Sequence, residues 1–251
     1  LGSLPALPAQ SGSGLELLAV KPFSALIQGW QRWLAGPQAL AILGGGAAGV
    51  ELALALAPQV AKLTLLTASN LLSGHPPALR RRALKHLARQ GVTVQEHCPV
   101  DAVVGQQLLS NGRMVWQGAR VIVASGASAL PWLADSGLAC DEQGFVQINA
   151  LLQSTSHSTV CAVGDCASLA HCPHNGVYAV RQGPVLAQNL TALLHGQPLQ
   201  TFRPQRRALA LLATGDGGAL ASWAGLTGEG PLFGYWKDHL DRGFMQRHRI
   251  P

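Results

Sequence analysis

The order of apolar and polar positions predicts alternating strands and helices over most of the chain. Short runs that are apolar throughout, such as 39–43 and 121–124, are typical of strands buried on both faces. Stretches such as 47–57 and 77–90 instead place apolar residues at helical spacing. This alternation predicts an α/β fold with a parallel sheet covered on both faces.

The remaining elements are predicted from local signals. Pro5 and Pro8 are expected to break any regular element near the start, and Asn111-Gly112 is typical of a hairpin turn. The other predicted elements are a strand within 11–20, a helix from Lys21-Pro22 through Trp33 and Leu34 that ends at Gly36-Pro37, strands 62–67, 92–96, 145–148 and 159–163, short segments around Val103, Leu108 and Val115, a helix 176–195, a hairpin 207–223 that turns at 216–218, and an amphipathic helix 232–247.

Composition narrows the class of protein. Of the 251 residues, 48% are hydrophobic and 12% are charged, which excludes intrinsic disorder. The mean hydropathy is +0.20, but no apolar run approaches the roughly 20 residues that a membrane-spanning helix needs. The high apolar fraction is therefore attributed to buried strands.

The net charge of +6 is concentrated in one predicted helix. Its basic residues interleave with an apolar stripe and not with aromatic side chains, so no nucleic-acid partner is predicted. The alternatives are a solvated helix face or a surface for phosphate or an acidic partner. The residues concerned are Arg80, Arg81, Arg82, Lys85 and Arg89.

The cysteines indicate a reducing compartment and no metal. There are five, without a CxxC pair, which argues against a disulfide framework and favours a cytoplasmic location. Cys166, His171, Cys172 and His174 lie close in sequence, but adjacent His171 and Cys172 are difficult to direct at one ion. We expect ordinary loop residues and buried thiols there, with no metal site.

The strongest motif is AILGGGAAGVELALALA, residues 41–57. Gly44, Gly46 and Gly49 fit G-x-G-x-x-G between a predicted strand and a predicted helix. Gly44 would permit the tight turn, Gly46 would let the backbone approach a pyrophosphate, and Gly49 would allow close helix–sheet packing. The motif predicts a Rossmann-like dinucleotide site at the helix N-terminus.

The second half of this fingerprint is missing. Where an acidic residue would hold the adenosine ribose, the chain has Thr67, Ser69 and Asn70, and no Arg follows the strand directly. These neutral groups still hydrogen-bond hydroxyls. The choice between NADH and NADPH therefore stays open.

Two later segments also end predicted strands with ligand-type residues. Ala124-Ser125-Gly126 lies at the carboxyl edge of the predicted sheet, where ligands of doubly wound folds bind. In TVCAVGDCASL, Gly164 would let the backbone approach a ligand, and Asp165 would accept hydrogen bonds from sugar-type hydroxyls. A helix-like continuation is expected after this pair.

Together, these segments resemble the pyridine nucleotide–disulfide oxidoreductase superfamily of flavoproteins. Its nicotinamide fingerprint, GxGxxGxE, is matched through Glu51, and its A-x-G strand end through Ala124 and Gly126. Its flavin segment is matched by Gly164 and Asp165. The stretch that follows is matched by Pro173, Gly176, Ala179, Gln182 and Gly183. The resemblance implies a doubly wound nicotinamide-nucleotide domain plus the C-terminal part of an FAD domain.

The resemblance also implies an activity. It is closest to the type II NADH dehydrogenase branch, an FAD-dependent NAD(P)H oxidoreductase in which hydride passes from nicotinamide to flavin and on to a small-molecule acceptor such as a quinone. The implied cofactor contacts are Gly44, Gly46, Gly49, Glu51, Thr67, Gly126, Gly164, Asp165 and Gln182, with Asp165 on the FAD ribityl chain and Glu51 near the nicotinamide ring. No acid–base catalyst is assigned.

The resemblance implies four ranges along the chain: 1–36 as an FAD-domain remnant and connecting helix, 37–127 as the NAD(P)-binding domain, 128–200 as the returning FAD segment, and 201–251 as a C-terminal hairpin and helix. The family's N-terminal FAD βαβ unit has no counterpart here, so this chain alone is expected to bind FAD poorly.

Two further associations follow from family likeness. Segments after residue 176 resemble the oxidoreductase module fused to selenide, water dikinase, and the alternative function is a non-catalytic nucleotide-binding or regulatory module linked to selenophosphate synthesis. Residues 232–247 could contact the inner face of a membrane peripherally, although packing of that helix on its own domain is favoured.

Overall fold

The computed structural model describes residues 2–33, 39–205 and 208–248, which form two compact units. The sheet unit comprises 7–126 and 209–251, and the α4 unit comprises 1–6 and 127–208. Each is described by itself. Within the described ranges, no helix is long and apolar enough to cross a bilayer.

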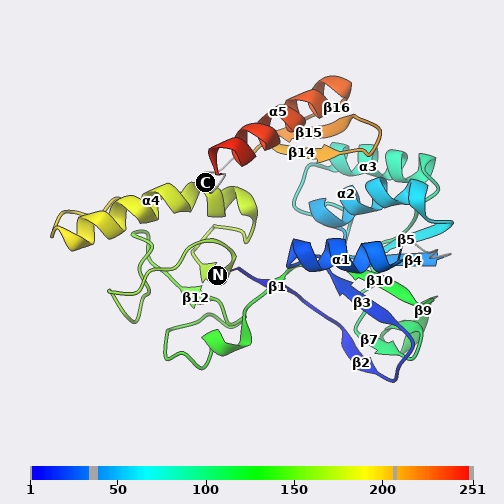
Figure 1. The fold of residues 1–251 in the computed structure, drawn as a ribbon, viewed down its shortest axis with the longest axis horizontal. Helices are drawn as coiled ribbons and strands as arrows, with labels where there is room; N and C mark the ends of the chain where they lie inside the picture. Colours follow the sequence, from blue (N-terminus) through cyan, green and yellow to red (C-terminus); the bar gives the residue numbers. More distant parts are fainter. Residues whose placement is uncertain (1, 34–38, 206–207, 249–251) are drawn as a thin grey trace. The chain divides into compact units, whose positions relative to one another are not determined.

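A five-stranded parallel sheet forms the centre of the sheet unit (Figure 1). Its strand order is β3-β10-β4-β5-β6, and every neighbouring pair is parallel. The strands are β3 (Glu16–Ala19), β10 (Arg120–Val123), β4 (Ala39–Leu43), β5 (Lys62–Leu66) and β6 (Thr93–Gln95). The α/β class and the parallel sheet are thereby confirmed.

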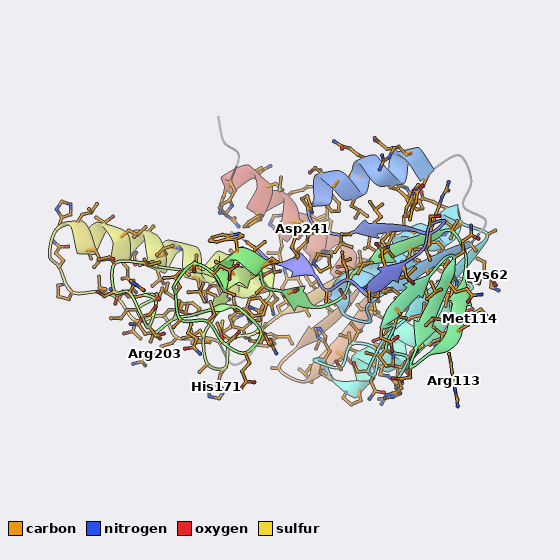
Figure 2. All side chains as sticks on the ribbon, turned by 90° about the horizontal axis from the view of Figure 1, so that it is seen from below. Lys62, Arg113, Met114, His171, Arg203 and Asp241 are labelled. Carbon is orange, nitrogen blue, oxygen red and sulfur yellow. The ribbon has the colours of Figure 1, made fainter. Side chains whose placement is uncertain are left out.

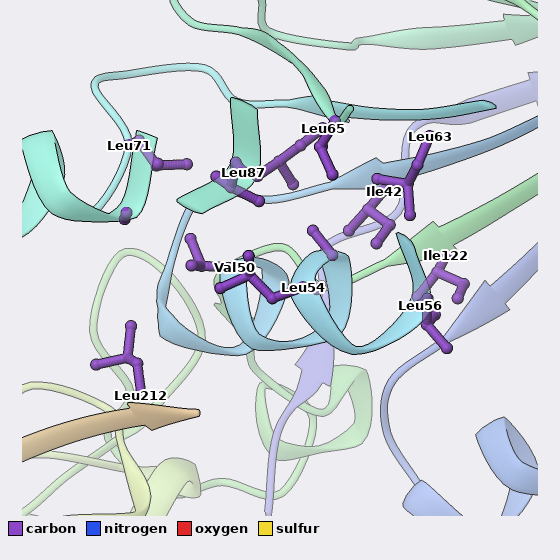
Figure 3. Packing of buried hydrophobic residues seen from close by; sticks show 14 of the residues in the cluster. Ile42, Val50, Leu54, Leu56, Leu63, Leu65, Leu71, Leu87, Ile122 and Leu212 are labelled. Atoms are coloured by element: carbon purple, nitrogen blue, oxygen red, sulfur yellow. The ribbon is translucent and has the colours of Figure 1, made fainter. Parts of the chain in front are cut away.

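Both faces of this sheet are covered, by different partners. Helices α1 (Phe23–Trp33), α2 (Ala47–Leu56) and α3 (Pro77–Arg89) pack on one face. Figure 3 shows Val50 and Leu54 of α2 over that face, close to Ile42. The opposite face, with Ala41 and Leu43, packs against a second sheet instead of helices. That sheet has the order β2-β7-β8-β9, from β2 (Ala9–Ser11), β7 (Ala102–Val104), β8 (Gln107–Ser110) and β9 (Arg113–Gln117).

Residues 210–247 add a further layer to the same unit. Strands β14 (Ala210–Ala213), β15 (Ala219–Trp223) and β16 (Leu226–Gly230) form an antiparallel sheet, and α5 (Pro231–Arg247) packs on it. Gly234 of α5 lies so close to the Gly217 carbonyl that a Cβ would overlap it. The favoured packing of α5 on its own domain is confirmed. The sequence pattern did not predict β16.

The α4 unit has little regular sheet. It contains β1 (Leu4–Pro5) paired with β11 (Ala127–Ser128), β12 (Val146–Gln147) paired with β13 (Ala167–Ser168), and the long helix α4 (Gly176–Leu194). Tyr178 of α4 is buried in its core beside Leu133, Leu152 and Phe202.

Three local expectations are wrong. Pro5 and Pro8 do not prevent pairing, because β1 and β2 find partners on either side of Pro8. Residues 159–163 form no strand, because Cys161 has only an isolated bridge to Gln153. After Gly164 the chain makes one 3₁₀ turn, Gly164–Cys166, and the strand β13 rather than a helix.

The boundaries of the units also differ from the four predicted ranges. Much of the predicted FAD remnant 1–36 belongs to the sheet unit, because β3 hydrogen-bonds to β10 in the central sheet. Residues 209–251, predicted as a separate C-terminal range, belong to that unit as well, since Leu212 and Leu220 join its core. The predicted helix end at 36–37, like the boundary between the first two ranges, lies outside the described residues.

Candidate functional site

The glycine-rich loop between β4 and α2 is built around two positions that tolerate no side chain. Gly44 has φ +124°, and a Cβ there would overlap the carbonyl oxygen of Ala124 on β10's extension. A Cβ on Gly49 would overlap the carbonyl oxygen of Gly44. The Gly44 N–H donates to the Leu66 carbonyl at 2.9 Å, which fixes the loop to β5. These contacts explain two glycines of the fingerprint by packing.

The third glycine faces open space. Gly46 is the N-cap residue of α2, is exposed, and would have no atom within 4 Å of an added Cβ. No side chain caps the helix there, so the first N–H groups of α2 are not bonded to a capping side chain. An open helix N-terminus that presents backbone N–H groups suits the phosphates of a dinucleotide.

Thr67 closes one side of this loop. Thr67 directly follows β5 and is 6% exposed. It packs so closely on the loop that a Cβ added to Gly45 would overlap the Thr67 hydroxyl oxygen. Leu72 then donates its N–H to the Gly45 carbonyl at 2.7 Å, so the chain after β5 folds back on the loop. Gly126 follows β10 at the same sheet edge, also with open space at its Cα. The structure therefore brings five predicted residues to one edge: Gly44, Gly46, Gly49, Thr67 and Gly126.

Glu51 lies on α2, and its side chain contacts β14 and α5. Its Oε1 accepts a hydrogen bond from the Ala213 backbone N–H at 2.8 Å and lies 3.5 Å from Lys237 Nζ. Burial lowers the pKa of Lys237, but the hydrogen bond to Asp241 and the charge of Glu51 outweigh it, so the pKa is raised. The predicted position of Glu51 beside a nicotinamide ring stays a prediction.

Glu96 is an acidic residue close to the position where the family's ribose-binding acid is missing, and the sequence analysis did not single it out. Glu96 follows β6, next to β5, and its carboxylate accepts from both Arg80 Nε at 2.8 Å and the Leu71 N–H at 2.5 Å. A further ion pair joins Arg80 Nη2 and Glu96 Oε2. The hydrogen bond from Arg80 holds the pKa of Glu96 below its usual range. The position of Glu96 as the last residue of the predicted strand 92–96 was the signal that could have revealed it.

The predicted flavin residues lie together in the α4 unit. Gly164 has φ +74°, and its N–H donates to Gln182 Oε1 at 2.6 Å. Gln182 is 2% exposed and also donates to Cys172 Sγ at 3.6 Å. Asp165 accepts a hydrogen bond from Ser3 Oγ at 3.2 Å. A buried glutamine thus fixes the turn that presents Asp165.

The side chains of the cysteine–histidine segment in the same unit do not gather into one cluster. Across the described ranges, no three His, Cys, Asp or Glu side chains gather to hold an ion. Burial raises the pKa of the Cys166 and Cys172 thiols, which disfavours thiolates. His174 stacks on Phe145 with ring centroids 4.0 Å apart. Figure 2 shows His171 at the outside of this unit.

Comparison with known proteins identifies the family. The profile of the pyridine nucleotide-disulphide oxidoreductases matches residues 2–189. The chain is 28% identical over 204 residues to demethylphylloquinone reductase NdbB of Synechocystis sp., covering 76% of this chain and 50% of that protein. It is 26% identical over 216 residues to the type II NADH:quinone oxidoreductase of Haemophilus influenzae, covering 77% and 48%.

Structural similarity extends over nearly the whole chain. The sulfide:quinone oxidoreductase of Aquifex aeolicus superposes with a TM-score of 0.77 at 17% identity, covering 98% of this chain and 67% of that one. The chain spans about half the length of the curated relatives it matches. The residues that match the family profile include the glycine loop and the later motifs on which the predicted resemblance rests. The chain belongs to the pyridine nucleotide-disulphide oxidoreductase family.

Proposed function

We propose that the chain is the nicotinamide-binding unit and part of the flavin unit of an FAD-dependent NAD(P)H oxidoreductase. The observation that carries this is the uncapped N-terminus of α2 at Gly46, open to a phosphate, inside a chain that matches the family. Nicotinamide and flavin together would supply the hydride chemistry, and the protein would bind and orient them. A quinone is the proposed acceptor, in line with the names of two relatives.

The sheet unit has residues suited to the nicotinamide nucleotide, and the α4 unit has residues suited to the flavin. The loop around Gly46 would hold the nucleotide diphosphate through backbone N–H groups. The turn at Gly164 has left-handed φ, so it approaches a ligand without a side chain, and Asp165 would accept from the flavin side chain's hydroxyls. The N-terminus of α4 would direct its partial positive charge at the flavin ring, although Asn175 already caps two of its N–H groups.

The test begins with protein purified in the presence of added FAD, because this chain alone is expected to bind FAD poorly. Flavin absorbance that NADH or NADPH bleaches without oxygen, and that a soluble quinone restores, is the expected result. Protein that binds nucleotide but supports no turnover with any acceptor would instead favour the non-catalytic regulatory module. Absence of both flavin and nucleotide binding would overturn the proposal.

Two associated proposals concern a partner protein and a membrane. The selenide, water dikinase partnership stays a prediction from the segments after residue 176. Peripheral membrane contact through 232–247 has one motivating feature: Leu232, Tyr235 and Met245 of α5 are 75%, 72% and 65% exposed. We expect the wild-type protein to co-sediment with anionic vesicles and Leu232→Glu to lose this binding. Wild-type protein that stays in the supernatant would contradict the membrane proposal.

A further inference from the structure

The carboxyl ends of β5 and β6 carry polar side chains where the adenosine ribose of a bound dinucleotide would lie. We name Thr67, Ser69, Asn70 and His97 the ribose edge. Thr67 lies against Gly45 of the phosphate loop, and Leu72, five residues later, is bonded to the same Gly45. The intervening residues, which include exposed Ser69 and Asn70, are therefore held at the rim of the loop.

The acid nearest to this edge is already neutralised. Glu96 precedes His97, but its two oxygens are taken by Arg80 and by the Leu71 N–H. Its carboxylate is 18% exposed. A dinucleotide that reaches the ribose edge therefore meets an ion pair with no net charge, rather than a carboxylate that would repel a phosphate.

The polar groups of the ribose edge are partly bonded to one another and leave the Asn70 amide nitrogen for a ligand. His97 Nε2 and Asn70 Oδ1 are 3.1 Å apart, which engages the amide oxygen of Asn70. The amide nitrogen of Asn70 is then the atom that remains to donate to a ligand. The exposed Ser69 hydroxyl donates to the Asn70 backbone carbonyl at 3.3 Å, so it donates to a ligand only after turning away from that carbonyl. An amide N–H and a hydroxyl that turns toward the ligand are suitable partners for phosphate oxygens, and His97 orients the Asn70 amide.

Long-range charge acts in the same direction. Arg80 lies in the first turns of α3 at this edge, and the helix carries four further basic side chains. Arg82 is balanced by Glu229, but Arg81 and Lys85 are exposed. The net positive charge of α3 raises the local concentration of the more highly charged nucleotide.

We infer that the nucleotide site admits a 2′-phosphate, so that NADPH binds as well as NADH, with the Asn70 amide and the Ser69 hydroxyl as its partners and His97 as the residue that positions Asn70. This inference rests on the proposed function, because it names the nucleotide class of the same site. The absence of the usual ribose acid would then be a feature of specificity, in which the edge accepts both sugars.

The test compares nucleotide affinities of the purified protein. NADH and NADPH, together with the fragments 5′-AMP and 2′,5′-ADP, are titrated by calorimetry. We expect the two dinucleotides to have dissociation constants within about threefold of one another, and 2′,5′-ADP to bind more tightly than 5′-AMP. These readouts need neither flavin nor turnover.

Two variants locate the phosphate. Asn70→Asp keeps the acceptor for His97 and the shape of the side chain but adds a negative charge. It is expected to weaken NADPH on the order of tenfold and to leave NADH unchanged. His97→Asn, which suits the left-handed φ of +56° at that position, is expected to weaken 2′,5′-ADP but not 5′-AMP.

Gln117→Glu is the matched control for Asn70→Asp. Gln117 is the exposed last residue of β9 in the second sheet, and the chain enters the amino end of β10 at Arg120, whereas the ribose edge lies at the carboxyl ends of β5 and β6. Gln117→Glu makes the same change from amide to acid and is expected to alter neither affinity.

Three results would overturn the inference. NADPH that binds more than tenfold more weakly than NADH would refute it while nucleotide binding stands. Equal loss of both nucleotides in folded Asn70→Asp would place the 2′-phosphate elsewhere. Binding of neither nucleotide to the wild type would remove this inference together with the proposed function.

Discussion

The carboxylate of Glu51 accepts a hydrogen bond from the backbone N–H of Ala213 at 2.8 Å, across 162 positions of sequence. Glu51 lies on the helix whose N-terminus forms the phosphate site, and Ala213 ends β14. Lys237 of α5 adds an ion pair at 3.5 Å. The nucleotide-binding helix and the C-terminal layer are therefore joined by one side chain.

This relationship predicts different effects for two substitutions of Glu51. Glu51→Ala leaves the Ala213 N–H without its acceptor and is expected to lower the free energy of unfolding by about 1 kcal/mol. Glu51→Gln retains an amide oxygen for Ala213 and loses only the charge facing Lys237, so its loss should be smaller. Denaturant titration measures both. Equal losses in the two variants would mean that the hydrogen bond contributes nothing.

The glycines of the loop predict two separable phenotypes. Gly49→Ala forces a Cβ into the carbonyl oxygen of Gly44, so we expect marked loss of thermal stability, and loss of nucleotide binding with it. Gly46→Ala has open space and should keep the folded stability nearly unchanged while weakening nucleotide binding, because its Cβ occupies the approach to the phosphates. Circular dichroism melting and nucleotide titration separate them. A Gly46→Ala protein with wild-type affinity would remove the phosphates from this loop.

The central sheet was predictable from sequence because local pattern and tertiary environment agree there. The strand 39–43 is apolar at every position, and the structure buries it between α2 and the second sheet, so β4 begins and ends at the predicted residues. Helix α3 likewise follows its apolar stripe, which places Leu79, Ala83 and Leu87 in the core.

The misses share a physical cause, which is dependence on distant partners. Residues 159–163 have the composition of a strand, but a strand also needs a neighbour that offers a continuous ladder, and Cys161 finds only one bridge. The pairing of Pro5 with Ala127 was not predicted, because the partner lies 122 positions away and leaves no local signal in the sequence. The engagement of Glu51 by Ala213 was hidden for the same reason.

We expect the buried side chain of Gln182 to hold the turn at Gly164 in place. Gln182→Ala removes the acceptor from the Gly164 N–H and leaves a buried gap, so we expect a loss on the order of 1–3 kcal/mol in unfolding free energy and lower flavin content. Gln188→Ala is the control, since Gln188 is exposed on the same helix. Denaturant titration and flavin absorbance of purified protein report the two effects. Unchanged flavin content in a stable Gln182→Ala protein would show that this turn does not contact the cofactor.

The ion pair between Arg80 and Glu96 predicts how stability responds to acid. The hydrogen bond from Arg80 lowers the pKa of Glu96 from its ordinary value of 4.5. Because the folded state holds the proton less tightly than the unfolded state, the stabilisation is fully present above pH 4.5 and is lost as the pH falls through the lowered pKa.

Glu96→Gln keeps an oxygen for the Leu71 N–H but removes the charge and this pH dependence. We therefore expect the wild type to be more stable than Glu96→Gln near neutral pH, and the difference to shrink progressively below pH 4.5. Denaturation midpoints of both proteins between about pH 7 and pH 3 measure it, and Asp238→Asn, in an exposed pair with Arg242, controls for charge loss elsewhere. A stability difference that stays constant over this range would contradict the assignment, since the charge of Glu96 would then not be what stabilises the edge.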